Sequence, residues 1–197
     1  MEKIRELNIL IAGVGGQGII LASEIICRVA LINGQNATIG ETYGASQRGG
    51  SVLSHVRIGK DTHGPLIPFG RADIVLGFEP IECARVALLY LADGGWIISN
   101  SSPIFPVDVI TRKTKYPSLE NLKSLVGNVT NNVFFFDAVA LACEAGDVLS
   151  LNMVMVGVFA TSHKNPFPKE DFEREIETLP QSALNLHAFK LGCDVNI

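Results

Sequence analysis

Residues 7–18 read LNILIAGVGGQG, an apolar run that ends in a glycine-rich loop. Leu7–Ala12 is short, apolar and ended by glycines, which predicts a buried β-strand. From Gly18 to about Ile32 the apolar residues recur with helical spacing, and Asn33-Gly34 supplies a helix stop. Ala37–Ile39 predicts a second strand. Together these segments predict a Rossmann-like first β-α-β unit with a parallel crossover.

Strand-like and helix-like segments alternate through the rest of the chain. The predicted strands are Ser51–Ile58, Ala72–Phe78, Trp96–Ser99 and Val133–Phe136. The predicted helices are Pro80–Leu91, Asp137–Glu144, Asn152–Ala160, Lys169–Leu179 and Ala183–Lys190. Gly40–Gly50 is predicted as a loop, Gly94-Gly95 as a turn, and Thr111–Asn132 as the least regular stretch. We therefore expect a three-layer α/β fold with a mostly parallel sheet, in one domain over residues 1–197.

The composition narrows the classes of function. Hydrophobic residues make up 47% of the 197 residues and charged residues only 18%, as in a sheet buried on both faces or a surface covered by partner chains. The net charge of −4 argues against a nucleic-acid-binding module, which normally has a clustered basic face. No apolar run approaches the roughly 20 residues of a membrane span, and Met1–Glu6 lacks a signal-peptide core. We expect a cytoplasmic protein.

The four cysteines, Cys27, Cys83, Cys143 and Cys193, are scattered and form no C-x-x-C pair. Neither a disulfide framework nor the local spacing of a zinc or iron–sulfur site is present. We therefore expect no metal site and no cofactor held by this chain alone. No complete catalytic constellation occurs either, and His55 is expected to be a half-buried structural residue, so no catalytic residue is predicted.

The loop after the first strand satisfies the spacing G-x-G-x-x-G through Gly13, Gly15 and Gly18. Such a loop lets the backbone approach a phosphate, and the free N–H groups of the following helix favour an anion. Glu41, after the predicted second strand, has the place of an acid that binds a ribose hydroxyl. Three interpretations stay open. The loop binds a dinucleotide, or its glycines, including Gly16, serve only the packing of the helix on the sheet, or the loop, which contains Gln17, binds another anionic ligand.

A second glycine-bearing segment, residues 40–50, reads GETYGASQRGG. It gathers polar and charged side chains between glycines, and Arg48 can make a bidentate contact with a carboxylate or a phosphate. The plainer interpretation is a surface loop in which Arg48 pairs with Glu41. We predict a ligand-binding or interface role for both segments, carried by Gly13, Gly15, Gly16, Gln17, Gly18, Glu41, Ser46, Gln47, Arg48, Gly49 and Gly50.

The two segments in succession, GVGGQG at 13–18 and GETYGASQRGGSVLSHVR at 40–57, resemble the gamma-type domain of 2-oxoacid:ferredoxin oxidoreductases. The resemblance is greatest to the beta subunit of the indolepyruvate type. Pro65–Pro68 and Ala72–Pro80 strengthen it, as does the length of the chain. The pyruvate type tends towards E-R-R-G-A-P around the arginine, so Gln47–Ser51 favours the indolepyruvate type.

The resemblance implies a non-autonomous subunit of an enzyme that oxidatively decarboxylates a 2-oxoacid to an acyl-CoA and passes electrons to ferredoxin. It places thiamine diphosphate and the iron–sulfur clusters in a larger partner subunit, with coenzyme A as co-substrate, and it allows a contact between two copies of this chain. Two alternatives stay open from the residues themselves. One is an autonomous NAD(P)- or flavin-binding oxidoreductase that uses the Gly13–Gly18 loop, and the other is a structural interaction protein without a ligand.

Overall fold

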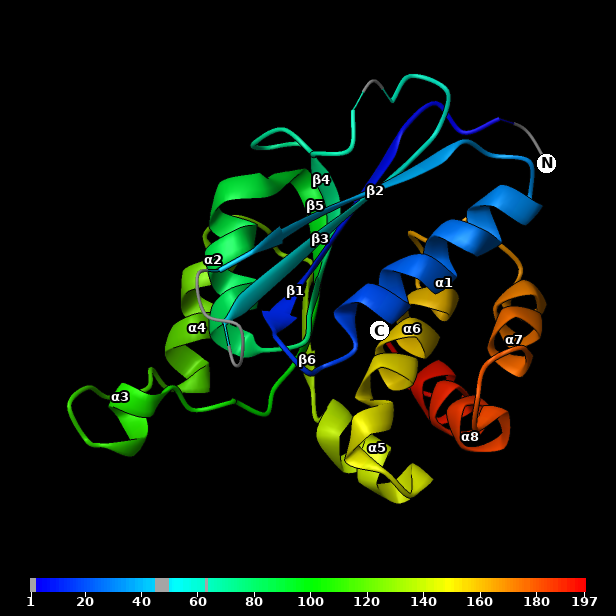
Figure 1. Ribbon diagram of the computed structural model, residues 1–197. Helices are drawn as coiled ribbons and strands as arrows, with labels where there is room; N and C mark the ends of the chain where they lie inside the picture. Colours follow the sequence, from blue (N-terminus) through cyan, green and yellow to red (C-terminus); the bar gives the residue numbers. More distant parts are fainter. Residues whose placement is uncertain (1–2, 45–49, 63) are drawn as a thin grey trace.

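The computed structural model describes residues 3–44, 50–62 and 64–197. Six strands form one sheet in the order β2-β3-β1-β4-β5-β6. Figure 1 shows this sheet nearly edge-on between the helices. The pairs β1–β4, β4–β5 and β5–β6 are parallel, and only β3 runs against its neighbours β1 and β2. The strands are β1 Leu7–Val14, β2 Ala37–Tyr43, β3 Ser51–Ile58, β4 Ala72–Gly77, β5 Leu91–Asn100 and β6 Val133–Phe136.

Helices cover both faces of this sheet (Figure 1). On one face lie α2 (Pro80–Tyr90) and α4 (Leu119–Gly127). The other face carries α1 (Ile19–Ile32), α5 (Ala138–Ala145), the short turn η1 (Val148–Ser150), α6 (Leu151–Thr161), α7 (Lys169–Glu177) and α8 (Ser182–Cys193). The predicted three-layer α/β fold with a mostly parallel sheet is confirmed.

Each face of the sheet has its own apolar core because side chains alternate along a strand. In β1, Ile9 and Ile11 pack towards α1 and α6, whereas Leu10 and Ala12 pack towards α2. All four residues are fully buried. The run LNILIA, which is apolar except for the buried Asn8 and shows no polar alternation, is therefore what a strand covered on both faces requires.

The first β-α-β unit has the predicted connection, but its two strands are not neighbours in the sheet. β2 runs in the same direction as β1, but β3 lies between them and is antiparallel to both. β3 is buried along nearly its whole length, whereas β2 is buried only at Gly40. The more apolar strand therefore takes the inner position, and the polar strand forms the edge of the sheet.

Three local predictions were wrong. β2 continues to Tyr43, so the first residues of the predicted 40–50 loop belong to a strand. β5 begins at Leu91 and contains the predicted Gly94-Gly95 turn, where the pairing with β4 shifts register. The stretch 111–132 contains α4, whose N-cap Ser118 accepts a hydrogen bond from the N–H of Asn121. No helix among the described residues has the length and apolar character needed to cross a membrane.

Candidate functional site

The glycine loop connects the carboxyl end of β1 to the start of α1. Gly16 and Gly18 have φ angles of 103° and 75°, in the left-handed region that favours glycine. Gly18 also lies against α6, where an added Cβ would come 2.5 Å from the Asn152 side-chain nitrogen. No side chain of the described residues caps α1, so its first-turn N–H groups are available to an anion.

Gln17 fixes the shape of this loop. Its side chain is nearly buried, and its Oε1 accepts a hydrogen bond from the N–H of Val14 at 2.8 Å. Its Nε2 donates to the carbonyl of Phe78, just after β4, also at 2.8 Å. An added Cβ on Gly13 would lie 2.5 Å from Gln17 Oε1, so Gly13 makes room for this clamp. Gln17 therefore acts on the loop, with both ends of its amide in use.

A second buried amide extends the clamp along the carboxyl ends of the parallel strands. Asn100, at the end of β5, donates from Nδ2 to the same Phe78 carbonyl at 3.1 Å. Its Oδ1 accepts from the N–H of Ala138 at 3.2 Å, which fixes the start of α5. Sequence reasoning missed this residue. The available signal was a polar amide directly after the predicted strand Trp96–Ser99 and before Ser101-Ser102-Pro103.

The two glycine segments meet at a backbone hydrogen bond: the N–H of Gly15 donates to the carbonyl of Gly50 at 2.9 Å. Between them lies a cleft of about 340 Å³. Ile20 and Tyr43, both exposed, form part of its apolar wall. The full lining is Val14, Gly15, Gly16, Gly18, Ile19, Ile20, Tyr43, Gly44, Gly50, Ser51 and Val52.

The predicted site residues differ in their relation to this cleft. Gly15, Gly16, Gly18 and Gly50 line it, whereas Gly13 and Gln17 lie behind the lining and fix the shape of the loop. Ser46, Gln47, Arg48 and Gly49 lie outside the described residues. Glu41 does not line the cleft and lies on β2, the strand at the side of the sheet.

Glu41 pairs with Ser54 across β2 and β3. Its carboxylate accepts a hydrogen bond from the Tyr43 hydroxyl, and this bond raises the pKa of Tyr43. β3 separates Glu41 from β1 and the glycine loop. In a dinucleotide-binding fold, the ribose-binding acid follows the strand next to the first one. The interpretation of Glu41 as a ribose ligand is therefore not supported by its place in the sheet.

Further clefts open beside the glycine loop, along the same edge of the sheet. One of about 420 Å³ is lined by Gly15, Gly16, Gln17 and Asn100, together with apolar side chains of the loop that follows β5 and of the segment from α5 to α6. Another, of about 280 Å³, contains Ser51, Glu79 and Glu82. In open α/β sheets, ligands bind outside the carboxyl ends of the strands. The region at the carboxyl ends of the parallel strands, with its three clefts, is therefore the candidate functional site.

Ser51, Glu82 and Arg85 form a polar cluster at this edge that sequence reasoning missed. Ser51 Oγ lies 2.6 Å from Glu82 Oε2, and an Arg85 guanidinium nitrogen lies 2.7 Å from Ser51 Oγ and 2.5 Å from the Glu82 carboxylate. Because Ser51 also borders the 340 Å³ cleft, the cluster connects the two clefts. Ser51 directly follows Gly50, so its proximity to the second segment was the available signal.

His55 and the four cysteines line none of the three clefts described above. His55 is 2% exposed, and its Nδ1 accepts a hydrogen bond from the N–H of Ile67 at 3.1 Å. Burial, and then the charge of Arg57, lower the pKa of His55 to about 4, so the ring is neutral. The four cysteines are free and lie on four different helices. The described residues contain no cluster of three His, Cys, Asp or Glu side chains suited to a metal ion.

The chain is similar to known proteins over nearly its whole length. Residues 8–195 match the family described as pyruvate ferredoxin/flavodoxin oxidoreductase. The chain is similar to indolepyruvate oxidoreductase subunit IorB of Pyrococcus horikoshii, with 42% identity over 193 residues, which cover 96% of this chain and 95% of that relative.

Solved structures share the fold. The gamma subunit of a keto/oxoacid ferredoxin oxidoreductase from Geobacter sulfurreducens superposes with a TM-score of 0.68 at 25% identity, covering 94% of this chain and 95% of that one. A 2-oxoglutarate:ferredoxin oxidoreductase from Magnetococcus marinus, solved with 2-oxoglutarate, coenzyme A and succinyl-CoA bound, has a TM-score of 0.70 at 20% identity. That match covers 97% of this chain but 31% of the other, so the same fold occurs there within a longer polypeptide.

Proposed function

We propose that this chain, which belongs to the pyruvate ferredoxin/flavodoxin oxidoreductase family, is the gamma-type subunit of a 2-oxoacid:ferredoxin oxidoreductase of the indolepyruvate type. The complex converts a 2-oxoacid and coenzyme A to an acyl-CoA and carbon dioxide, and two electrons pass to ferredoxin. Thiamine diphosphate and the iron–sulfur clusters belong to a larger subunit. This chain forms one wall of the shared site and is inactive alone.

The observation that carries the proposal is the hydrogen bond from Gly15 to Gly50. It brings the two segments that resemble the family to one cleft, at the uncapped start of α1. Backbone N–H groups at a helix start favour an anion, and Arg48 adds a guanidinium from the segment between Gly44 and Gly50. The anion is a phosphate of coenzyme A or the carboxylate of the 2-oxoacid.

The other residues of the edge have supporting roles. Gln17 and Asn100 hold the ends of β1, β4 and β5 in register through the Phe78 carbonyl. Ile20 and Tyr43 supply apolar walls that exclude water once the larger subunit covers them. These residues shape the loop that meets the ligand, and no proton transfer or bond cleavage is assigned to them.

Purification of the native complex tests the subunit assignment. We expect this chain to co-purify with a larger subunit that contains thiamine and iron, and ferredoxin reduction to require both chains. Isolation of a single, coloured and fully active chain would overturn the assignment. A titration of the purified chain with NADH addresses the dinucleotide alternative, and we expect no saturable micromolar binding because β3 displaces Glu41 from the loop.

An Arg48→Lys substitution tests the anion contact. Lysine retains the charge but loses the planar fork that binds two oxygens at once. We therefore expect turnover to fall about tenfold or more, together with the affinity for coenzyme A or for the 2-oxoacid, while the complex still assembles. Arg28→Lys is the matched control, because Arg28 forms an exposed pair with Glu24 on α1. Unchanged turnover and coenzyme A affinity in the Arg48 variant would refute the contact.

A further inference from the structure

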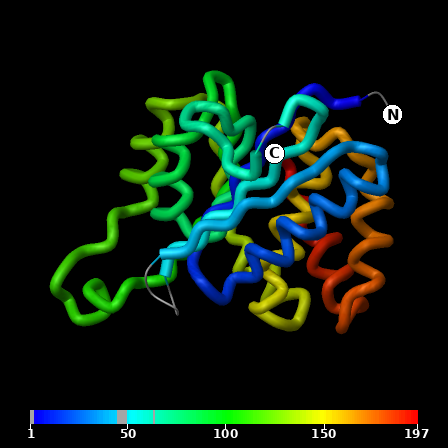
Figure 2. The backbone as a smooth tube through the Cα atoms, turned by 45° about the horizontal axis from the view of Figure 1, so that its top comes forward, coloured from blue at the N-terminus to red at the C-terminus, as the bar shows by residue number. Residues whose placement is uncertain are grey.

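Residues 103–115, between β5 and α4, form a segment that we call the arm. It contains the four-residue helix α3 (Val107–Ile110), which has no buried residue. Every residue of the arm except Val109 is exposed. Figures 1 and 2 show the arm extending from the body of the protein, away from the sheet and from both helix layers.

The arm exposes large apolar side chains that this chain does not cover. Val107 is 72% exposed and Ile110 is 68% exposed. Ile104 and Phe105, nearer the base, are also about half exposed. Contiguous apolar residues on a projecting element are typical of a protein–protein contact, whereas single scattered ones are ordinary.

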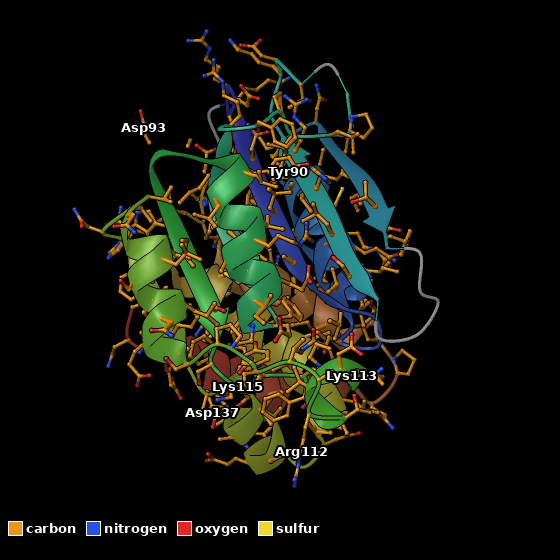
Figure 3. The ribbon with its side chains drawn as sticks, turned by 90° about the vertical axis from the view of Figure 1, so that its left-hand side faces the viewer. Tyr90, Asp93, Arg112, Lys113, Lys115 and Asp137 are labelled. Atoms are coloured by element: carbon orange, nitrogen blue, oxygen red, sulfur yellow. The ribbon has the colours of Figure 1, made fainter. Side chains whose placement is uncertain are left out.

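The arm is also basic within a chain of net charge −4. Arg112, Lys113 and Lys115 follow α3, and Figure 3 shows all three at the same end of the molecule. Among the described residues, Arg112 and Lys115 have no ion-pair partner, and Lys113 lies 3.8 Å from the carboxylate of Asp108, where both groups are exposed. Exposed cations that lack partners in their own chain complement carboxylates on another surface.

The base of the arm is fixed to the candidate site. The Tyr116 hydroxyl donates a hydrogen bond to Glu79, a carboxylate that is 2% exposed and also accepts from the N–H of Glu82 at 2.9 Å. The rings of Phe105 and Tyr116 meet edge to face, with centroids 5.3 Å apart. Burial, and then Glu79, raise the pKa of Tyr116, so its hydroxyl keeps the proton that it donates.

This anchorage has two consequences. First, the base of the arm is held in place before docking, so docking does not have to fix it at that moment. Second, Ile104, Phe105 and Val107 line the 280 Å³ cleft with Ser51 and Glu79, so the arm is continuous with the edge that carries the glycine loop. A partner that closes the candidate site from this side therefore contacts the arm.

We propose that the arm docks into an apolar groove bordered by carboxylates on the larger subunit, with Val107 and Ile110 in the groove and Arg112 and Lys115 on its acidic rim. This inference rests on the proposed function, since it names the surface through which this chain joins its partner. The alternative occupant, a second copy of this chain, is separated by the experiment.

The experiment measures the affinity of this chain for the larger subunit isolated from the native complex. Val107→Asp/Ile110→Asp tests the apolar contact, and Arg112→Glu/Lys115→Glu tests the charges. The matched controls are Leu31→Asp/Ile32→Asp, at the far end of α1 with similarly exposed side chains, and Lys60→Glu/Lys190→Glu, two exposed lysines without ion pairs among the described residues. Circular dichroism and thermal melting of each isolated variant verify that it folds.

We expect both arm variants to lose about tenfold or more in affinity, and both controls to bind like the wild type. The loss in the charge variant should shrink at high salt because exposed charges are screened. Trypsin should cleave after Arg112, Lys113 or Lys115 in the free chain and more slowly in the complex.

Wild-type affinity in both folded arm variants would overturn the docking proposal and leave the subunit function intact. Failure of the wild-type chain itself to bind the larger subunit would instead refute the proposed function, and the docking proposal with it. Sedimentation separates the remaining case: if the arm variants abolish self-association while they still bind the larger subunit normally, the occupant is a second copy and the proposal is wrong.

Discussion

Gln17 and Phe78 are 61 positions apart in the sequence, and the Gln17 side-chain amide donates to the Phe78 carbonyl at 2.8 Å. The other end of the same amide accepts from the N–H of Val14. One side chain therefore holds the glycine loop against the carboxyl end of the neighbouring parallel strand. The shape of the loop is therefore fixed by a residue whose own polar atoms form hydrogen bonds within the protein.

Gln17→Ala should destabilise the chain by about 1–3 kcal/mol. The substitution leaves the Val14 N–H without its acceptor and removes one of the two side-chain hydrogen bonds to the Phe78 carbonyl. Urea unfolding monitored by circular dichroism measures the change. Asn121→Ala, which removes an exposed amide on α4, should stay within about 0.5 kcal/mol of the wild type. Equal stabilities of the two variants would refute the clamp.

Gly18 and Gly34 offer a matched pair, with φ angles of 75° and 74°. Alanine at either position costs about 1 kcal/mol or more for the left-handed backbone. Gly18→Ala should cost more, because its Cβ would come 2.5 Å from Asn152 whereas the space around Gly34 is open. Thermal unfolding of both variants tests this order. The reverse order would show that α6 does not constrain the start of α1.

Ser54→Ala should leave stability unchanged or raise it by about 1 kcal/mol. Ser54 is fully buried on β3, and its Oγ is the only buried side-chain oxygen or nitrogen among the described residues without a hydrogen-bond partner. Removing an unsatisfied hydroxyl removes its desolvation cost. The control is Ser23→Ala, since Ser23 is equally buried but donates to the Ile20 carbonyl at 2.7 Å. Chemical denaturation should show a loss for the Ser23 variant, and a similar loss for both would contradict the prediction.

His55 makes stability depend on pH. Its pKa is lowered to about 4 in the folded chain, against about 6.5 when unfolded. Between these values the unfolded chain binds a proton that the folded chain does not, so the free energy of unfolding falls as the pH falls from 6.5 to 4. The full effect is on the order of 3 kcal/mol.

His55→Gln tests this dependence. The stability difference between wild type and variant should shrink from pH 7 to pH 4.5, because carboxylates that titrate in both proteins cancel in the difference. His187→Gln, at an exposed histidine on α8, is the matched control substitution. A difference for His55→Gln that is constant with pH would mean that burial does not hold the ring neutral.

Local pattern predicted much of the fold. The run before the glycines predicts β1 because a strand buried on both faces needs continuous apolar residues. The span of β3 was predicted at both ends, and α1 follows from its apolar spacing and from glycine at each end. The α4 helix was missed because the surrounding stretch is polar, although its buried Leu122 and Val126 are four residues apart.

Tertiary structure alone decided which elements meet. The insertion of β3 between β1 and β2, the contact of Gly15 with Gly50, and the packing of Asn152 on Gly18 join segments that are distant in the sequence. The sequence by itself determined the class of the fold and both glycine segments, because periodicity reports which faces of an element are buried. Periodicity does not report which element covers each face, because that depends on how all the apolar surfaces of the chain pack into one core. This packing places β3 between Glu41 and the glycine loop, and it directs the Gln17 amide towards Val14 and Phe78.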